Sequence, residues 1–125
     1  MEQQNQIATI LIVEDHPPTL IAVQQLVSTA FPACRMLAAE SAEQALELCA
    51  NHLPRVVVMD IALPGMDGIE ATRRITSLLP DTRVVMHSNQ DLQIHREAAA
   101  AAGASAFVAK SRTFSEIVPA ITGLI

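Results

Sequence analysis

Five short apolar runs, each followed by a segment with helical spacing, constrain the fold of this chain more than any other feature. The runs are Ile7–Val13, Arg35–Ala39, Val56–Met59, Val84–His87 and Ala106–Ala109. Strands that are apolar on both faces are typical of parallel sheets covered by helices on both sides. Because crossovers between parallel strands are right-handed, five such units predict an α/β fold with a three-layer, doubly wound parallel sheet. The second run is the least apolar and is expected at an edge.

Sequence signals mark where the intervening helices begin and end. Ser41 with Gln44, and Asp67 with Glu70, form the pattern of a capping side chain followed three residues later by Glu or Gln. Gly103 follows an alanine-rich helical segment, in the place where glycine commonly ends a helix. These signals support helices after the second, third and fourth strands.

The size of the chain suits one domain with an aliphatic core. It has 125 residues, of which 50% are hydrophobic and only 2% aromatic. We expect a domain over residues 7–125, preceded by a short flexible tail at 1–6. No apolar stretch approaches the roughly 18 residues that span a bilayer, so no membrane segment is expected.

Charge and cysteine usage narrow the partners and the compartment. The net charge of −5 argues against direct nucleic-acid binding by this domain, because phosphate binding needs a basic surface. Cys34 and Cys49 lack the spacing of metal ligands and are interpreted as reduced thiols of a cytoplasmic protein.

Polar side chains follow four of the five strands at the point where each strand ends. They are Glu14, Asp15, Asp60, Ser88 and Lys110. Any one alone is more often a helix cap or a solvated side chain. Because ligands bind at the carboxyl ends of strands in open parallel sheets, five such residues at matching positions indicate a site.

Three carboxylates at one sheet edge would repel one another unless a cation or protons neutralised them. Hard oxygen ligands open to water suit Mg²⁺, which often works with phosphate. Lys110 adds a positive charge and Ser88 a hydroxyl donor, so the set suits a transferring phosphoryl group. Asp60, central in the strand order, is the expected nucleophile and would form an acyl phosphate.

Four stretches of the sequence carry a resemblance to a known family. They read Ile-Leu-Ile-Val-Glu-Asp-His-Pro (10–17), Val-Val-Val-Met-Asp-Ile-Ala-Leu-Pro-Gly-Met-Asp-Gly (56–68), Val-Val-Met-His-Ser (84–88) and Gly-Ala-Ser-Ala-Phe-Val-Ala-Lys (103–110). In this order and spacing they resemble the receiver domain of two-component response regulators, over about Ile7 to Ile121. The resemblance implies a flavodoxin-like sheet with strand order 2-1-3-4-5.

The resemblance also implies roles for single residues. Asp60 would accept a phosphoryl group from a phosphohistidine of a sensor histidine kinase. Asp15 would bind Mg²⁺ (or Mn²⁺) directly and Glu14 through water, with Asp60 and the backbone carbonyl of Ala62 completing the ligands. Ser88 would move toward the phosphoryl group.

By the same resemblance, Lys110 would pair with the phosphoryl group and Phe107 would turn inward. The surface that would then change is formed by the helix ending at Gly103, the fifth strand and the last helix. Members of the family commonly form dimers, so a homodimer through this surface is also possible by resemblance. Such a domain phosphorylates and dephosphorylates itself and is not a turnover enzyme.

The sequence departs from the commonest family pattern at three positions. Phe107 lacks the hydroxyl of the more usual tyrosine, and Ser111 follows Lys110 where proline is frequent. Pro119 is expected to bend or delay the last helix. The Asp15-His-Pro triplet and the Lys-Ser pair are similar to the LuxR-type branch, whose members usually control transcription through a helix-turn-helix domain. No such domain is recognised before Ile125, so a stand-alone receiver or part of a longer regulator is expected.

Three other functions compete with a phosphorylated switch. A pseudo-receiver acting only by protein–protein interaction would usually lack an acidic residue or the lysine, and all are present here. A phosphatase with an aspartate nucleophile, of the haloacid-dehalogenase type, would carry a second Asp at the position of Ala62. A nucleotide-binding flavodoxin-like protein would have a glycine-rich loop after the first strand, where this chain has Glu14-Asp15.

Overall fold

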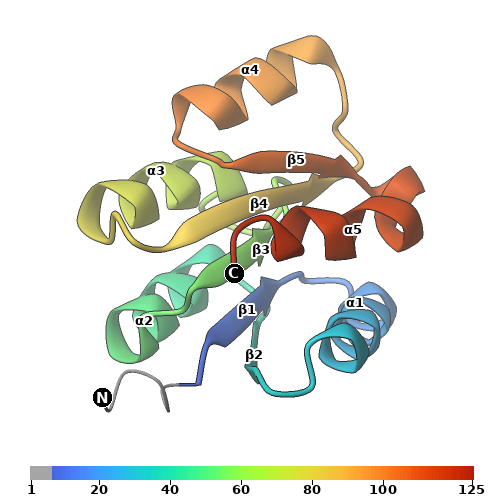
Figure 1. Ribbon diagram of the computed structural model, residues 1–125. Helices are drawn as coiled ribbons and strands as arrows, with labels where there is room; N and C mark the ends of the chain where they lie inside the picture. Colours follow the sequence, from blue (N-terminus) through green and yellow to red (C-terminus); the bar gives the residue numbers. More distant parts are fainter. Residues whose placement is uncertain (1–6) are drawn as a thin grey trace.

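The computed structural model describes residues 7–125 and shows one five-stranded parallel sheet (Figure 1). Its strands are β1 (Thr9–Val13), β2 (Arg35–Ala39), β3 (Val56–Met59), β4 (Arg83–Ser88) and β5 (Ala106–Ala109). They lie in the order β2-β1-β3-β4-β5, so the predicted fold class and strand order are confirmed. The tail predicted at residues 1–6 lies outside the described residues.

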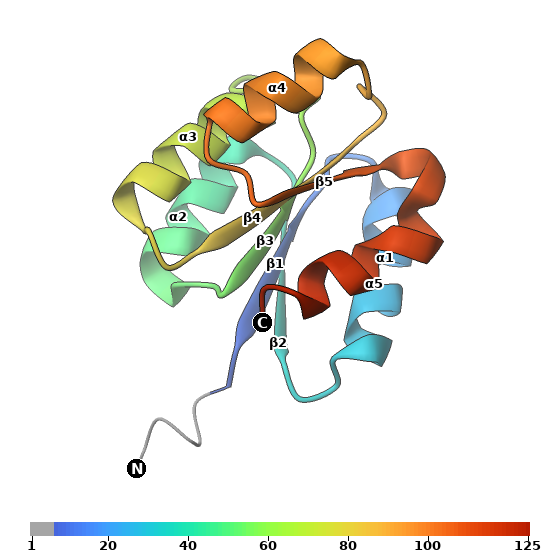
Figure 2. The same cartoon turned by 45° about the horizontal axis from the view of Figure 1, so that its top comes forward.

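Helices cover both faces of the sheet. They are α1 (Pro17–Ala30), α2 (Ala42–His52), α3 (Gly68–Leu78), α4 (Gln93–Ala101) and α5 (Thr113–Thr122), with a 3₁₀ turn, η2, at Lys110–Arg112. Figure 2 shows α2, α3 and α4 on one side of the sheet and α1 and α5 on the other. Within residues 7–125, none of these helices has the length and apolar character needed to cross a membrane.

The core is aliphatic and divided by the sheet into two clusters. Leu11 and Met59 face α2 and α3, while Ile12 and Val58 face α1 and α5. Because side chains alternate along a strand, strands that are apolar throughout supply both clusters at once. The sheet is therefore held firmly from both sides, and its strand ends form a rigid base for polar side chains.

The predicted capping signals are confirmed. Ser41 Oγ accepts a hydrogen bond from Gln44 N at 3.1 Å, and Asp67 Oδ1 accepts one from Glu70 N at 2.9 Å. Gly103 has φ +102° after α4, a conformation in which other residues are strained. β2 lies at the sheet edge, as its weaker apolar character predicted.

The expectation that Pro119 delays the last helix is wrong. α5 begins at Thr113 and continues through Pro119 to Thr122. Proline in a helix interior removes one backbone hydrogen bond, and the loss is tolerated here because packing holds the helix. Ile117 and Ile121, on either side of Pro119, are fully buried against the sheet.

Candidate functional site

The carboxyl ends of β1 and β3 bring three carboxylates together. Glu14 N donates to Ala39 O at 3.0 Å, and Asp60 N donates to Val13 O at 3.2 Å, so both residues extend the sheet ladder. Oxygen atoms of Glu14, Asp15 and Asp60 lie within 4.8 Å of one another. Glu14 and Asp60 are buried, whereas Asp15 is exposed. The cluster therefore has a closed inner side and an outer side open to water.

Lys110, at the end of β5, lies against the two buried carboxylates. Its Nζ donates a hydrogen bond to Asp60 Oδ2 at 2.8 Å and lies 2.8 Å from Glu14 Oε1. Burial opposes the charge of Lys110, but the hydrogen bonds and charges of Asp60 and Glu14 outweigh it and raise its pKa. Lys110 is therefore held as a cation at the centre of the site.

Glu14 is the least satisfied member of the cluster. Its side chain is 2% exposed, and Oε1 has no aligned hydrogen-bond donor although Lys110 is close. Burial raises the pKa of Glu14, while Lys110 and the His16 N–H, which donates to Oε2 at 3.2 Å, act in the opposite direction. A buried carboxylate beside two further carboxylates, with only Lys110 close to its Oε1, fits a hard divalent cation such as Mg²⁺.

Both carboxylate oxygens of Asp60 have partners. Oδ1 accepts a hydrogen bond from the Ala62 N–H at 3.2 Å, and Oδ2 accepts the one from Lys110. Ala62 lies exposed on the loop after β3, next to the acidic cluster. The loop thereby fixes the orientation of the Asp60 side chain before any ligand arrives.

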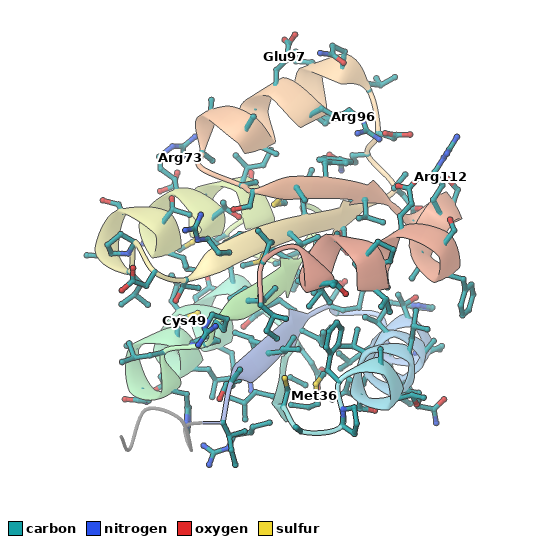
Figure 3. All side chains as sticks on the ribbon, viewed as in Figure 1. Met36, Cys49, Arg73, Arg96, Glu97 and Arg112 are labelled. Atoms are coloured by element: carbon teal, nitrogen blue, oxygen red, sulfur yellow. The ribbon has the colours of Figure 1, made fainter. Side chains whose placement is uncertain are left out.

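Ser88 ends β4 and is fully buried. Its Oγ accepts a hydrogen bond from Gln90 N at 3.0 Å, which leaves the hydroxyl hydrogen available to donate. Phe107 is half-buried, and the guanidinium of Arg96, which Figure 3 labels, lies over its ring at 4.5 Å from the centroid. Arg96 in turn binds Asp91 in the loop after Ser88. The loop and the aromatic ring are thus joined by an arginine that the sequence did not single out.

His87 forms a second connection that the sequence did not reveal. It is 3% exposed, and its Nε2 lies 2.7 Å from Thr113 Oγ1. Thr113 donates its hydroxyl hydrogen to Lys110 O at 2.9 Å, so His87 Nε2 must carry the proton and donate to Thr113. The two partners are 26 residues apart, and no local pattern relates them.

We expect His87 to make the protein acid-sensitive. Burial, and then the charge of Lys110, lowers the pKa of His87 from 6.5 to about 4. Between these values the unfolded chain binds more protons, so stability falls as pH drops from 6.5 toward 4. Roughly 2 kcal/mol should be lost by about pH 4.5. Urea unfolding at both pH values measures this loss.

The contribution of His87 is isolated by comparing His87→Gln with His52→Gln, since His52 is exposed. His87→Gln should flatten the pH dependence, and His52→Gln should leave it unchanged. Equal pH dependence in wild type and His87→Gln would contradict the assignment.

Comparisons with known proteins agree with this geometry. Residues 10–122 match the response regulator receiver domain family. The chain is 34% identical over 113 residues to the transcriptional activator protein ExaE of Pseudomonas putida. The aligned region covers 90% of this chain and 52% of ExaE. It is 28% identical over 114 residues to the nitrate/nitrite response regulator protein NarL of Escherichia coli, covering 91% of this chain and 53% of NarL. The chain spans about half the length of these relatives.

A solved structure shows the same likeness. The LuxR-family two-component response regulator from Aurantimonas superposes with a TM-score of 0.86 at 34% identity. The match covers 94% of this chain and 84% of that one.

Proposed function

Because the chain belongs to the response regulator receiver domain family, we propose that it is a phosphorylation-controlled switch whose acceptor is Asp60. The observation that carries the proposal is the position of Asp60. Its carboxylate is buried beside Glu14 and Asp15, and its Oδ2 is bound by Lys110. A nucleophile flanked by a cation and by ligands for a second cation suits phosphoryl transfer.

In the transfer, an oxygen of Asp60 forms a bond to phosphorus while the bond between phosphorus and the donor breaks. The leaving group keeps the electron pair of that bond. The Ala62 N–H holds Oδ1 and so fixes the carboxylate plane. Lys110 exchanges its contact with Oδ2 for one with a phosphoryl oxygen, and Ser88 donates its free hydroxyl hydrogen to another. Both contacts stabilise the added negative charge.

Glu14, Asp15 and Asp60 are the residues that would hold Mg²⁺ (or Mn²⁺), with the Ala62 carbonyl as a further ligand. Asp15 and Asp60 would bind directly and Glu14 through water. When bound, the ion would neutralise charge on the phosphoryl oxygens. The closeness of the three carboxylates and the open side at Asp15 support this assignment.

We expect Lys110→Met to destabilise the metal-free protein by about 2 kcal/mol, because two buried carboxylates lose their cation. Mg²⁺ should reverse much of this loss. Its affinity should rise at least about tenfold, because a competing positive charge is gone. Urea unfolding in EDTA and at increasing Mg²⁺ concentrations measures both effects.

Arg112→Met is the matched control, since Arg112 forms only an exposed ion pair with Glu116. It should change neither stability nor Mg²⁺ affinity appreciably. Unchanged or weaker Mg²⁺ affinity in Lys110→Met would argue against a cation site at these carboxylates.

We further propose that the donor is a sensor histidine kinase in the cytoplasm and that the output is control of transcription. The support is the similarity to ExaE and NarL, which are named as regulators. The changed surface would be the face of α4, β5 and α5, through the contact between Arg96 and Phe107. The same proposal includes a homodimer on that face and self-dephosphorylation. It also includes the absence of turnover on other substrates.

The experiment that tests the acceptor is intact-protein mass spectrometry after incubation with acetyl phosphate, with and without Mg²⁺. One Mg²⁺-dependent phosphoryl adduct is expected. No adduct on the folded protein under either condition would favour the pseudo-receiver.

A further inference from the structure

The arginines without an ion pair gather at one end of the molecule. The chain has eight Lys and Arg residues. Five of them contact carboxylates: Arg73, Arg74, Arg96, Lys110 and Arg112. Within the described part of the chain, residues 7–125, the other three have no salt bridge: Arg35, Arg55 and Arg83.

Backbone hydrogen bonds place these three arginines at the amino ends of the strands. Arg35 N donates to Ala8 O at 2.8 Å, Arg55 N to Thr9 O at 2.8 Å, and Arg83 N to Arg55 O at 3.0 Å. Because side chains alternate along a strand, Arg35 and Arg55 share the face of the sheet that α2 and α3 cover, with β1 between them, and Arg83 belongs to the other face. The amino ends form the edge opposite the carboxyl ends where Asp60 lies. Among residues 7–125, the carboxyl ends of the strands are therefore acidic, and the amino ends carry arginines that form no salt bridge with another described residue.

The same edge is hollowed, and both apolar and polar side chains line it. A hollow of about 360 Å³ is lined by Ile7, Leu53 and Arg55, with Ala8, Thr9 and His52. Leu53 and Arg55 also line a second hollow of about 250 Å³, together with Leu78 and Leu79. Leu78 and Leu79 continue into a third hollow of about 220 Å³ between α2 and α3. We call this run of hollows, with Ile7, Leu53, Arg55, Leu78 and Leu79, the amino-edge groove.

Three large apolar side chains of the amino-edge groove are exposed to water. Ile7 is 62% exposed, Leu53 65% and Leu78 75%. A rim of exposed aliphatic side chains next to unpaired arginines has the composition of a protein-binding surface, in which apolar contacts lie beside charged ones.

The backbone of Leu53 provides a second, independent observation. Leu53 has φ 48° and ψ 60°, and it is the only non-glycine residue with positive φ among those the structure describes. Gly or Asn would end α2 in this conformation at a lower cost. An exposed leucine gains nothing from the core in return. Strain kept at an exposed apolar side chain is a sign of a binding role.

We propose that the amino-edge groove binds an acidic segment of another protein that carries apolar side chains. Leu53 and Leu78 would contact the apolar side chains, and Arg55, with Arg35 on the same face of the sheet, would bind the carboxylates. A nucleic acid fits less well, because the net charge is −5 and aliphatic side chains line both hollows beside the polar ones. Asp81 lines the second hollow but not the first. Because Asp81 would repel the carboxylates of the partner, we place these carboxylates over the first hollow.

The proposal is tested by NMR titration of the ¹⁵N-labelled chain with a synthetic peptide built from glutamate and leucine. Amide shifts are expected at Leu53–Arg55 and Leu78–Arg83 and not around Asp60. A peptide with lysine in place of glutamate, a peptide with serine in place of leucine, and oligo(dT) serve as parallel probes. All three should leave the amino-edge groove unchanged.

Two variants connect the binding to named side chains. Arg55→Ala should weaken the glutamate–leucine peptide about tenfold, as expected for a charged contact at the centre of an interface. Leu53→Asn should weaken it similarly and yet raise Tm by about 3 °C, because asparagine accepts this backbone conformation more easily. Arg112→Ala is the control, because Arg112 (labelled in Figure 3) is an ion-paired arginine that follows β5, at the carboxyl ends of the strands.

Several outcomes would overturn the proposal. These are no shifts at the groove with the glutamate–leucine peptide, equal binding of the lysine or serine peptide, or shifts with oligo(dT) alone. Shifts that grow with protein concentration in the absence of peptide would assign the groove to a second copy of the chain instead. Asp60→Asn should bind the peptide as the wild type does, because Asp60 lies at the opposite end of the sheet. Failure of phosphorylation would therefore leave the peptide-binding proposal standing, and failure of peptide binding would leave the phosphorylation proposal standing.

Discussion

Asp60→Asn is expected to take up no phosphoryl group from acetyl phosphate, whereas the wild-type chain forms one adduct in the presence of Mg²⁺. Asparagine keeps the size of the side chain but loses the nucleophilic carboxylate oxygen and its charge. The amide can still accept a hydrogen bond from Ala62 N–H, so the fold should survive. Intact-mass measurement gives the adduct, and urea unfolding shows that the variant is folded.

The chemical nature of the adduct separates Asp60 from hydroxyl acceptors. An acyl phosphate is cleaved by hydroxylamine, while a phosphate ester on Ser88 would resist it. Asp67→Asn is the matched control, because Asp67 is an exposed helix cap and asparagine caps helices equally well. A hydroxylamine-resistant adduct, or one that persists in Asp60→Asn, would reject Asp60 as the acceptor.

Most of the fold followed from the sequence because the strands are apolar on both faces. The bounds of β3 and β5 agree with the predicted runs, Val56–Met59 and Ala106–Ala109. β1 is shorter than predicted, since it begins at Thr9 and Ile7 is 62% exposed. An apolar pattern cannot show where a neighbouring strand stops pairing. Ile7 lines the hollow at the amino ends of the strands, a surface position that the sequence could not reveal.

The grouping of the candidate site residues followed from topology. Parallel strands end at a common edge, so residues that follow β1, β3, β4 and β5 had to lie near one another. The details depended on tertiary contacts across distant segments. His87 meets Thr113, and Arg96 covers Phe107, only because α4 and α5 pack beside β5. The orphaned oxygen of Glu14 likewise depends on the angle at which Lys110 approaches it.

Gly68→Ala is expected to destabilise the protein by at least about 4 kcal/mol, a loss seen only when a substitution breaks close packing. A Cβ at Gly68 would lie 1.8 Å from the backbone oxygen of Asp60 and 2.7 Å from its carbonyl carbon. The Gly68 N–H also donates to Ile61 O at 2.9 Å, so α3 begins in direct contact with the backbone of Asp60 and Ile61. Neither backbone can yield without moving the Asp60 side chain. Urea unfolding measures the loss, and phosphorylation of any folded fraction should fall with it.

Gly123→Ala provides the same chemical change without the clash. The nearest atoms to its Cβ would be Ala120 O at 3.8 Å and Pro119 O at 3.9 Å, and φ is −69°. Alanine at such a position lowers the entropy of the unfolded chain, so a gain of up to about 1 kcal/mol is expected. Similar small effects at both glycines would show that α3 can move away from Asp60. The loop that orients the acceptor would then be adjustable, and the fixed orientation of the Asp60 carboxylate would have to come from Lys110 and Ala62 alone.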